Sequence, residues 1–305
     1  MSINRVRAAF AHCAFTGISG HHLGLLVTEL QPRYDAARED RLHQRRGHPR
    51  RRRAGGGPRP RLSFPHRLVA TLVHLRLGIP HAALAVVFDV DRTTITRAIT
   101  EIRTLLATRG FATDTGLRLH TLADVCAYAA AEGVTLRIDA TEIRVRRPRA
   151  HRPGRRAFIS GKMRQNTIKA TVIADERGST IWCGAIRPGR MHDQTALRVE
   201  GIDALLDAHP DLQALVDRGY QGLAKAHPDQ VEAPPLRLPA DATGDQKTVW
   251  ERTRKTQSSQ RIPVEHAIAE LKWWRVLQRF TGRRELAAQT ITAIAGLVSD
   301  RTITW

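Results

Sequence analysis

The sequence predicts an α/β protein in which an all-α domain precedes a domain built on a mixed sheet. Amphipathic helical patterns with capping residues fill positions 64–109. After about residue 115 the pattern changes to β-rich runs that alternate with helical segments, which is typical of an α/β domain. The 305 residues, 42% of them hydrophobic, supply enough apolar surface for about two domains.

The charge of the chain narrows the class of partner. Its net charge is +20 and its pI about 11.3, which favours a polyanionic partner and nucleic acid first. A membrane surface is the alternative, but there is neither a long apolar run nor a signal-peptide pattern. Cys13, Cys126 and Cys183 are isolated, so they predict reduced thiols rather than a zinc knuckle or disulfide framework. We therefore expect a cytoplasmic, nucleoid-associated protein.

The first 61 residues divide into a helical segment and a basic stretch. Residues 1–40 contain "HHLGLLVTEL", with apolar residues at helical spacing. Residues 41–61, "RLHQRRGHPRRRRAGGGPRPR", are rich in Arg, Gly and Pro and predict a flexible basic linker that contacts DNA. The alternative is a solvated linker without a partner.

Residues 62–112 predict a helix-turn-helix domain. One helix ends at Gly78, a second begins at Pro80, and a third runs from Asp91, as N-cap, to Gly110. The tight turn "DVD" between the last two is the helix-turn-helix pattern. The third helix places Ile95, Ile99, Ile102 and Leu106 on one apolar stripe. This stripe leaves four residues free for DNA contacts, namely Arg92, Thr93, Thr96 and Arg97. A plain three-helix bundle is the alternative.

Residues 130–300 predict the α/β domain. The run 134–147 indicates two β segments around a turn, and the runs 166–175 and 179–186 indicate a hairpin. A helical stretch follows at 192–208, then a short apolar strand within 211–217. A Pro-rich stretch, "EAPPLRLPADATGDQK", precedes the closing helices, the last pattern of which begins around Pro263.

Three acids stand where catalytic carboxylates are expected. Asp139 follows the apolar run "VTLRI", Asp217 follows "LQALV", and Glu265 lies in the first turn of a predicted helix. Carboxyl ends of strands are where α/β sheets place their sites, so the three side chains are expected to converge. Converging carboxylates need a cation, and oxygen ligands suit Mg²⁺, with Mn²⁺ as a substitute.

Each acid also has a structural interpretation. Asp139 is then a turn residue, and Asp217, ahead of "RGY", accepts a hydrogen bond in an Asx-turn. Glu265 is then a capping residue at the third helical position after Pro263. The presence of Ile262 at the cap position weakens that explanation, because a capping box needs Ser, Thr, Asp or Asn there.

Five motifs resemble one protein family. They are "DATE" (139–142), "GKMRQNTIKATVIAD" (161–175), "GRMHDQTAL" (189–197), "VDRGYQGL" (216–223) and "VEHAIAELKWWRVL" (264–277). In order and spacing they are similar to insertion-sequence transposases of the DDE superfamily endonuclease type, related to Harbinger-like transposases. The resemblance covers roughly residues 60–300, including the helix-turn-helix.

The resemblance implies an RNase H-like fold in which Asp139, Asp217 and Glu265 hold two Mg²⁺ ions. It also implies that Arg261 and Lys272, which fit the family's last motif around Glu265, meet the phosphates of transposon-end DNA. Ser258 departs from the pattern, since a tyrosine usually stands at that position.

Two further sets of residues are candidates for the site. Asp193, in an His-Asp pair that the family commonly has, is either an additional metal ligand or the N-cap of the following helix. Cations cluster after Asp139 and favour phosphate contacts over a solvated loop. Besides Arg144, Arg146, Arg149 and Arg156, these are Arg147, Arg155, Lys162, Arg164 and Lys169.

The sequence thus predicts a DNA transposase that binds terminal inverted repeats and performs metal-dependent strand cleavage and strand transfer. Because an element has two ends, we expect a homodimer or higher oligomer on double-stranded DNA. Two alternatives stay open: a non-catalytic DNA-binding regulator derived from a transposase, and a purely hydrolytic Mg²⁺-dependent endonuclease.

Overall fold

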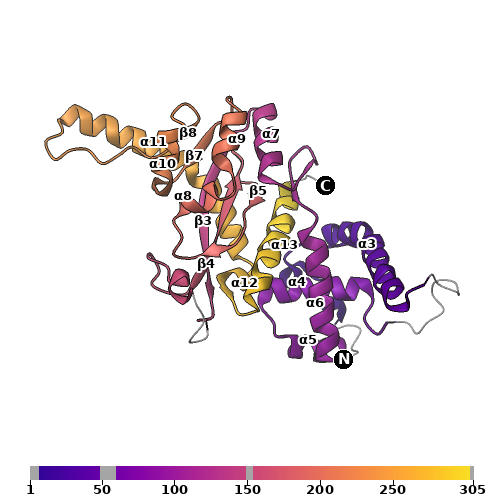
Figure 1. The fold of residues 1–305 in the computed structure, drawn as a ribbon. Coiled ribbons are helices and arrows are strands. Elements are labelled where there is room, and N and C mark those ends of the chain that lie inside the picture. Colours follow the sequence, from indigo (N-terminus) through magenta and orange to yellow (C-terminus); the bar gives the residue numbers. More distant parts are fainter. Residues whose placement is uncertain (1–6, 49–59, 149–153, 303–305) are drawn as a thin grey trace. The chain divides into compact units, whose positions relative to one another are not determined.

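The computed structural model describes residues 7–48, 60–148 and 154–302 (Figure 1). The chain forms two compact units, which we describe separately. A helical unit comprises Met1–Thr108 and Trp274–Val276, and a sheet-containing unit comprises Arg109–Trp273 and Leu277–Trp305. In the described part of the chain, no helix is both long and apolar enough to cross a membrane.

The helical unit has the three helices that the sequence predicts for a helix-turn-helix. They are α4 (Phe64–Leu77), α5 (His81–Phe88) and α6 (Arg92–Ala107), preceded by the short α2 (Cys13–Thr16) and by α3 (Gly20–Arg46). Gly78 ends α4 with φ +70°, a left-handed conformation that glycine adopts without strain. Pro80 and Asp91 occupy the N-cap positions of α5 and α6, as expected.

The predicted apolar stripe of α6 forms part of the core of this unit. Ile95, Ile99, Ile102 and Leu106 are all buried. Ile95 and Ile99 pack in one cluster with residues of α4 and α5, among them Val73, Leu84 and Phe88. Removing these apolar side chains from water is the main force that holds the three helices together.

The basic linker begins later than predicted. The prediction of a linker from residue 41 is wrong for 41–46, because α3 continues to Arg46. Its charged end is held by carboxylates: Arg46 pairs with Glu39 at 2.6 Å, and Arg41 pairs with Glu101 at 2.6 Å. Residues 49–59 of the predicted linker lie outside the described residues.

The sheet-containing unit is built around the long strand β3 (Leu136–Val145). On one side β4 (Thr167–Ala174) pairs antiparallel with β3, and β5 (Thr180–Cys183) pairs antiparallel with β4. On the other side β7 (Ala214–Val216) pairs parallel with β3, and β8 (Val231–Glu232) pairs parallel with β7. The order is therefore β5-β4-β3-β7-β8. Two short strands also pair with it, β6 (Arg187–Pro188) with β4 and β9 (Arg279–Phe280) with β3.

Helices cover this sheet. Helix α11 (Gly244–Lys272) packs against β3, β4 and β7, and α13 (Ala287–Ser299) packs against β5 and α11. The other helices of this unit are α7 (Leu122–Glu132), α8 (Asp193–Arg198), α9 (Ile202–Ala208) and α10 (Gln221–Ala226), and α12 (Arg275–Gln278) is divided between the two units. A small hairpin joins β1 (Phe111–Ala112) to β2 (Arg118–Leu119). The N-terminal part of α11 extends beyond the sheet (Figure 1, orange).

Two local predictions for this unit are wrong. The run 134–147 was expected to turn near Asp139, but β3 is one continuous strand that pairs with β4 from Arg137 to Arg144. Asp139 therefore lies inside a strand rather than at its end or in a turn. Likewise, no helix begins at Pro263, which lies inside α11. That helix starts at a capping box formed by Thr243 and Gln246, so Glu265 is not a capping residue.

The three thiols differ in accessibility. All are free, with Cys13 exposed and Cys126 and Cys183 buried. Burial raises the pKa of Cys126 to about 12 and raises that of Cys183 strongly. A charged thiol reagent added to the native protein at pH 8 should therefore modify one cysteine, identified as Cys13 by peptide mass mapping. A Cys13→Ser variant should react only after denaturation; rapid labelling of the native variant would contradict the burial of the other two.

Candidate active site and DNA-recognition helix

Helix α6 presents the polar face that was predicted to read DNA. Arg92, Thr93, Thr96 and Arg97 are all exposed. The hydroxyl of Thr96 donates to the carbonyl of Arg92 at 3.0 Å and lies 2.9 Å from Nδ1 of His81, which ties α6 to α5. Burial lowers the pKa of His81 to about 4, so its ring is neutral at physiological pH.

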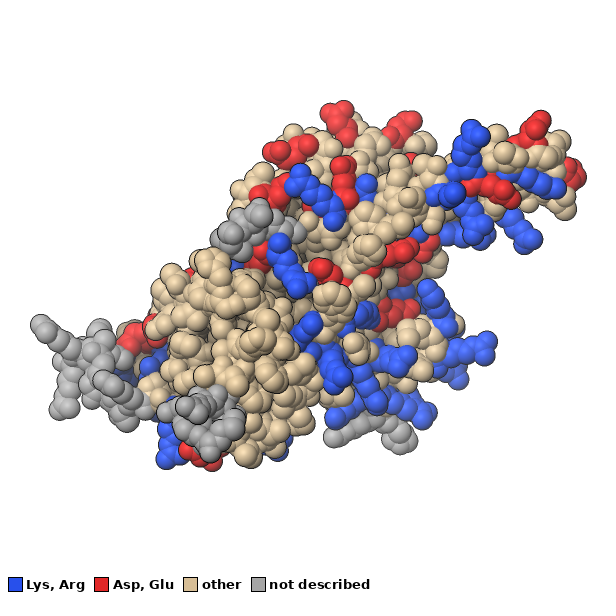
Figure 2. Space-filling model, turned by 180° about the vertical axis from the view of Figure 1, so that it is seen from behind, with Lys and Arg blue, Asp and Glu red and all other residues tan. Residues whose placement is uncertain are grey.

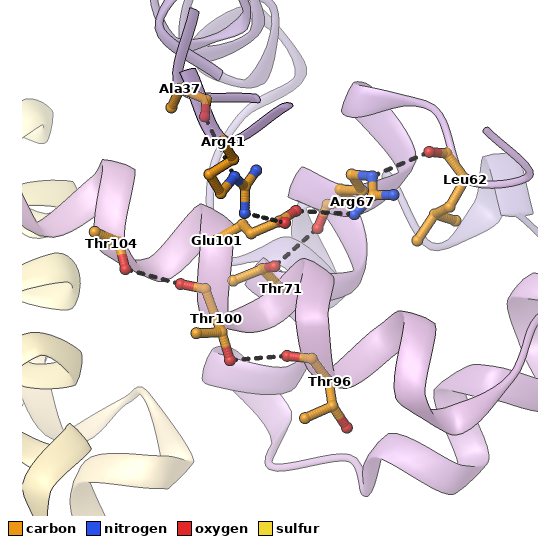
Figure 3. A network of polar contacts seen from close by, with 9 residues as sticks. All are labelled: Ala37, Arg41, Leu62, Arg67, Thr71, Thr96, Thr100, Glu101 and Thr104. Carbon is orange, nitrogen blue, oxygen red and sulfur yellow. Dashed lines mark hydrogen bonds and ion pairs between the residues drawn. The ribbon is translucent and has the colours of Figure 1, made fainter. Parts of the chain in front are cut away.

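A carboxylate fixes α6 against the rest of the helical unit (Figure 3). Glu101 accepts one bond from Arg41 of α3 at 2.6 Å and another from Arg67 of α4 at 3.0 Å. Arg67 also donates to the carbonyl of Leu62 at 3.1 Å. Because Glu101 lies on the helix that carries the exposed polar face, this shared ion pair sets the position of that face relative to α3 and α4.

In the sheet-containing unit, two of the three predicted catalytic acids meet around one cation. Nη2 of Arg261 lies 3.2 Å from Oδ2 of Asp139, and its Nη1 lies 3.6 Å from Oδ1 of Asp217. Asp139 comes from the fourth position of β3, and Asp217 directly follows β7, the parallel neighbour of β3. The guanidinium group of Arg261 is thus shared by Asp139, which lies 122 positions earlier in the sequence, and Asp217, which lies 44 positions earlier.

Two hydrogen bonds between α11 and the strands hold the helix, and with it Arg261, at this place. Gln257, which is buried one turn earlier, donates from its side-chain amide to the carbonyl of Val216 at 2.9 Å, next to Asp217. Arg137 of β3 donates from Nε to the carbonyl of Gln260 at 2.7 Å. These two bonds attach α11 to β7 and β3, so the position of Arg261 follows from the packing of the helix on the sheet.

The environment of Asp139 raises the pKa of its carboxyl. Burial is the largest of the causes that raise the pKa of this carboxyl to about 6, and the charges of Asp217 and Asp193 act in the same direction. The amide of Ala140, which donates to Oδ1 at 2.7 Å, and the Arg261 guanidinium oppose the rise. Oδ1 of Asp217 also accepts from the amide of Arg218, the next residue, at the start of a short 3₁₀ helix (Arg218–Tyr220). The Asx-turn predicted for Asp217 would instead use the amide two residues on.

Glu265 stands apart from these two acids. It follows Arg261 by four residues, which places it about one turn further along the same side of α11, and its side chain is exposed. No group of three His, Cys, Asp or Glu side chains able to hold a metal ion occurs among the described residues. The fold therefore brings Asp139 and Asp217 together at Arg261, whereas Glu265 lies about one helical turn beyond Arg261 on α11.

Asp193 is engaged by a lysine. Its Oδ1 lies 2.5 Å from Nζ of Lys169, a residue of β4 whose side chain is buried. His192, rather than Asp193, holds the N-cap position of α8, so the capping interpretation of Asp193 is wrong. Lys169 points to this acid and to Glu142, 4.0 Å away, and is thus enclosed by carboxylates.

Glu142 is a polar residue of the site that sequence reasoning did not single out. It accepts from the hydroxyls of Ser160 at 3.0 Å and Thr167 at 2.7 Å. Its backbone carbonyl accepts from Nζ of Lys272. The signal in the sequence is its spacing of three from Asp139 within one β run, although the threonine and serine partners become evident only once β4 pairs with β3.

The remaining predicted cations fall into two groups. Lys272 is partly buried, and burial lowers its pKa to about 8, an effect that Glu142 opposes and Arg144 reinforces. Arg147, Lys162 and Arg164 are exposed, and Arg155 is partly buried. Arg149 lies outside the described residues. The exposed cations are available to an anionic ligand, whereas Lys169 and Arg261 are already paired with aspartates.

The donor set suits a divalent cation. Asp139 and Asp217 converge on a single positive group, which shows that the fold balances their charges with a cation at this place. The carboxylate oxygens are the ligands that Mg²⁺ and Mn²⁺ prefer. The two aspartates therefore fit an oxygen-coordinated metal site, whereas Glu265 stands apart from them on α11.

Comparison with known proteins places this architecture in a family. Residues 60–112 match the family described as the helix-turn-helix of DDE superfamily endonuclease. A protein of Microchaete diplosiphon, described as a probable transposase for insertion sequence element IS702, is 26% identical over 163 residues. That match covers 52% of this chain and 54% of the relative, so the chain spans about half the length of the curated relative it matches. No solved structure matches.

The family of the chain follows from a match that covers more than half of its length. Residues 138–299, more than half of the 305, match the family described as DDE superfamily endonuclease. This match begins one residue before Asp139 and includes Asp217, Arg261 and Glu265. The chain therefore belongs to the DDE superfamily endonucleases, the transposase type in which a helix-turn-helix precedes the endonuclease domain.

Proposed function

We propose that this protein is a DNA transposase that binds the ends of an insertion sequence and cleaves and joins DNA strands with a divalent metal. The observation that carries the proposal is the convergence of Asp139 and Asp217 on one cation at adjacent parallel strands. In two-metal nucleases, carboxylates hold the ions that stabilise the attacking and leaving oxygens at phosphorus.

The strand order supports an RNase H-like assignment for the catalytic domain. Three antiparallel strands, β5, β4 and β3, are followed by two short parallel strands, β7 and β8. Such a sheet puts an acid in the middle of the central strand beside an acid at the end of its parallel neighbour. In this chain these positions are occupied by Asp139 and Asp217, and α11 supplies Glu265 from the covering helix.

The proposed roles follow from these positions. Asp139 and Asp217 hold the Mg²⁺ ions together with Glu265, and Asp193 lies near enough to join them if Lys169 releases it. When bound, the metal supplies charge stabilisation at the attacking and leaving oxygens of a phosphodiester. Arg261 then turns from the aspartates toward a phosphate, and Lys272, held beside Glu142, places a second positive charge along α11. One site serves both strand cleavage and strand transfer, because both are displacements at phosphorus.

The helical unit supplies recognition of the terminal inverted repeats. Its exposed face on α6 carries two arginines for phosphates and two threonines for base edges, which is the division of labour that helix-turn-helix proteins use. Pairing two element ends requires two copies of the chain, so we propose a homodimer or higher oligomer on DNA.

The test is a nicking assay on duplex DNA that carries the inverted repeats flanking the gene. We expect strand cleavage that leaves a 3′-hydroxyl, that requires Mg²⁺ or Mn²⁺, and that stops when the metal is chelated. Specific binding of the same DNA without any metal-dependent cleavage would instead support a regulator derived from a transposase. Cleavage without joining of a pre-cut end to a second duplex would support a hydrolytic endonuclease.

A further inference from the structure

The strand that carries Asp139 ends in a cavity lined by arginines. The pairing of β9 with β3 sets Arg144 opposite Arg279 and Val145 opposite Phe280. Beyond this pair lies a cavity of about 430 Å³. Its lining includes four arginines and a single acid, namely Arg146, Arg147, Arg283, Arg284 and Glu285. Two segments more than 130 residues apart in the chain thus form one strongly positive hollow.

The charges of this cavity are not balanced within the protein. Arg283 is exposed and lies 3.8 Å from Glu285, itself exposed, which is a weak surface contact. Arg146, Arg147 and Arg279 are exposed as well and form no ion pair in the described part of the chain. Figure 2 shows Lys and Arg side chains gathered at one end of the sheet-containing unit. Such an excess of guanidinium groups attracts an anion with several oxygens.

The floor of the cavity is rigid. Phe280 is buried, and a Cβ at position 282 would lie 2.9 Å from its ring, so the turn between β9 and the arginines needs Gly282. The guanidinium of Arg284 lies 4.1 Å from the ring centre of Phe158, which holds that arginine in place. On this side of the cavity Arg284 is therefore held in place, and on the other side Arg146 directly follows β3.

We infer that this arginine cavity is a second DNA contact, which grips the phosphodiester backbone of the duplex at a distance from the cleavage site. Arginine forks match phosphate oxygens, and neither ring at the cavity is free to stack on a base, since Phe280 is buried and Phe158 is covered by Arg284. The ligand is thus the backbone of double-stranded DNA, read without regard to sequence.

In this proposal the duplex lies along β3, so the spacing along that strand gives the position of the contact on the DNA. Arg146 follows Asp139 by seven residues, and a strand rises about 3.3 Å per residue, so the cavity lies about 23 Å from the catalytic position. Phosphates of one DNA strand recur every ~3.4 Å along the helix axis, which makes this distance about seven base pairs. This inference rests on the proposed function, because it takes Asp139 as the point where cleavage occurs.

The experiment measures how binding depends on salt. The double variant Arg146→Ala/Arg283→Ala removes two exposed charges from the cavity and none from the proposed catalytic machinery. The DNA is a 30-base-pair duplex centred on the outer end of the inverted repeat, which is the expected cleavage position. Without metal, the slope of log Kd against log salt should fall by about 1.8, since each lost phosphate contact contributes about 0.9. The matched control Arg177→Ala/Arg198→Ala, which removes two exposed arginines elsewhere in the unit, should leave the slope unchanged.

Trimmed duplexes then locate the contact. Two further DNAs are cut back, on one side or the other, to five base pairs from the cleavage position. The difference in salt slope between the wild type and the cavity variant should vanish on one trimmed duplex and persist on the other. An unchanged slope on the full duplex overturns the inference, and so does a difference that persists on both trimmed duplexes, because the contact would then lie close to Asp139.

Folding and function are controlled separately. The variant Arg146→Lys/Arg283→Lys keeps both charges and should restore the wild-type slope, and circular dichroism should show the same melting temperature for all variants. If wild-type protein binds DNA with the expected slope change but never cleaves it, the proposed function fails while the contact stands. If wild type cleaves and the cavity variant binds with an unaltered slope, only the present inference fails.

Discussion

Replacement of Asp139 or Asp217 by Asn should reduce metal-dependent nicking by roughly a thousandfold or more. A bound metal contributes several kcal/mol to stabilising the transition state, and about 1.4 kcal/mol corresponds to a factor of ten in rate. Asn keeps the size of the side chain and an oxygen for Arg261, which lies 3.2 Å from Asp139 and 3.6 Å from Asp217, so the fold should survive. The measurement is single-turnover nicking of end-containing duplex in saturating Mg²⁺.

The control for this prediction is DNA binding by the same variants. Because the exposed face of α6 lies in the helical unit, the affinity for the inverted repeat should change less than threefold, as followed by fluorescence anisotropy. Asp193→Asn provides the comparison between the two candidate partners of Asp139. Full nicking by Asp217→Asn together with loss of nicking in Asp193→Asn would transfer the second aspartate role to Asp193.

Substitution of Asp300 by Ala should destabilise the sheet-containing unit by about 3–5 kcal/mol. The carboxylate of Asp300 is fully buried and pairs with two arginines, Arg109 at 2.5 Å and Arg118 at 2.6 Å. Arg109 precedes β1 and Arg118 begins β2, so this acid at the end of α13 ties the first segment of the unit to its last. Its removal takes this carboxylate away from the buried guanidinium of Arg109 and the partly buried one of Arg118.

Urea unfolding followed by circular dichroism measures this effect as a drop in the midpoint concentration. The matched control is Asp211→Ala, which removes an exposed acid and should change stability by no more than about 0.5 kcal/mol. A midpoint for Asp300→Ala equal to that of the control would show that the arginines find other partners or water, and that the buried ion pair does not stabilise the fold.

Local patterns accounted for the helical unit because its elements are decided by neighbours in the sequence. The spacing of Ile95, Ile99 and Ile102 defined one face of a helix, and Gly78 and Asp91 marked ends that the structure reproduces. The same reasoning ended the helical segment at residue 40, whereas α3 continues to Arg46. Charged residues after position 40 resemble a linker unless carboxylates elsewhere pair with them, as Glu101 of α6 does with Arg41.

Patterns were less informative in the sheet-containing unit, where long-range pairing decides the outcome. The acid in "VTLRIDATEIRV" suggested a break, but β4 pairs along the whole run and β7 pairs with its first part, so the strand continues through Asp139. Pro263 suggested a helix start, yet the capping box at Thr243 begins the helix earlier, and bonds through Gln257 and Gln260 hold it against the sheet. Pro263 then costs α11 one backbone hydrogen bond that the packing compensates.

By itself the sequence determined the helix-turn-helix, the strongly positive charge, and the choice of Asp139, Asp217 and Glu265 as candidate ligands, because residue type, helical period and motif order are properties of the chain. Only the tertiary structure decided that Arg261 lies between the two aspartates, that Lys169 pairs with Asp193, and that arginines that follow β3 and β9 line one cavity. The physical reason is that a side chain's electrostatic partner is set by strand pairing and helix packing between distant segments, which no local pattern specifies.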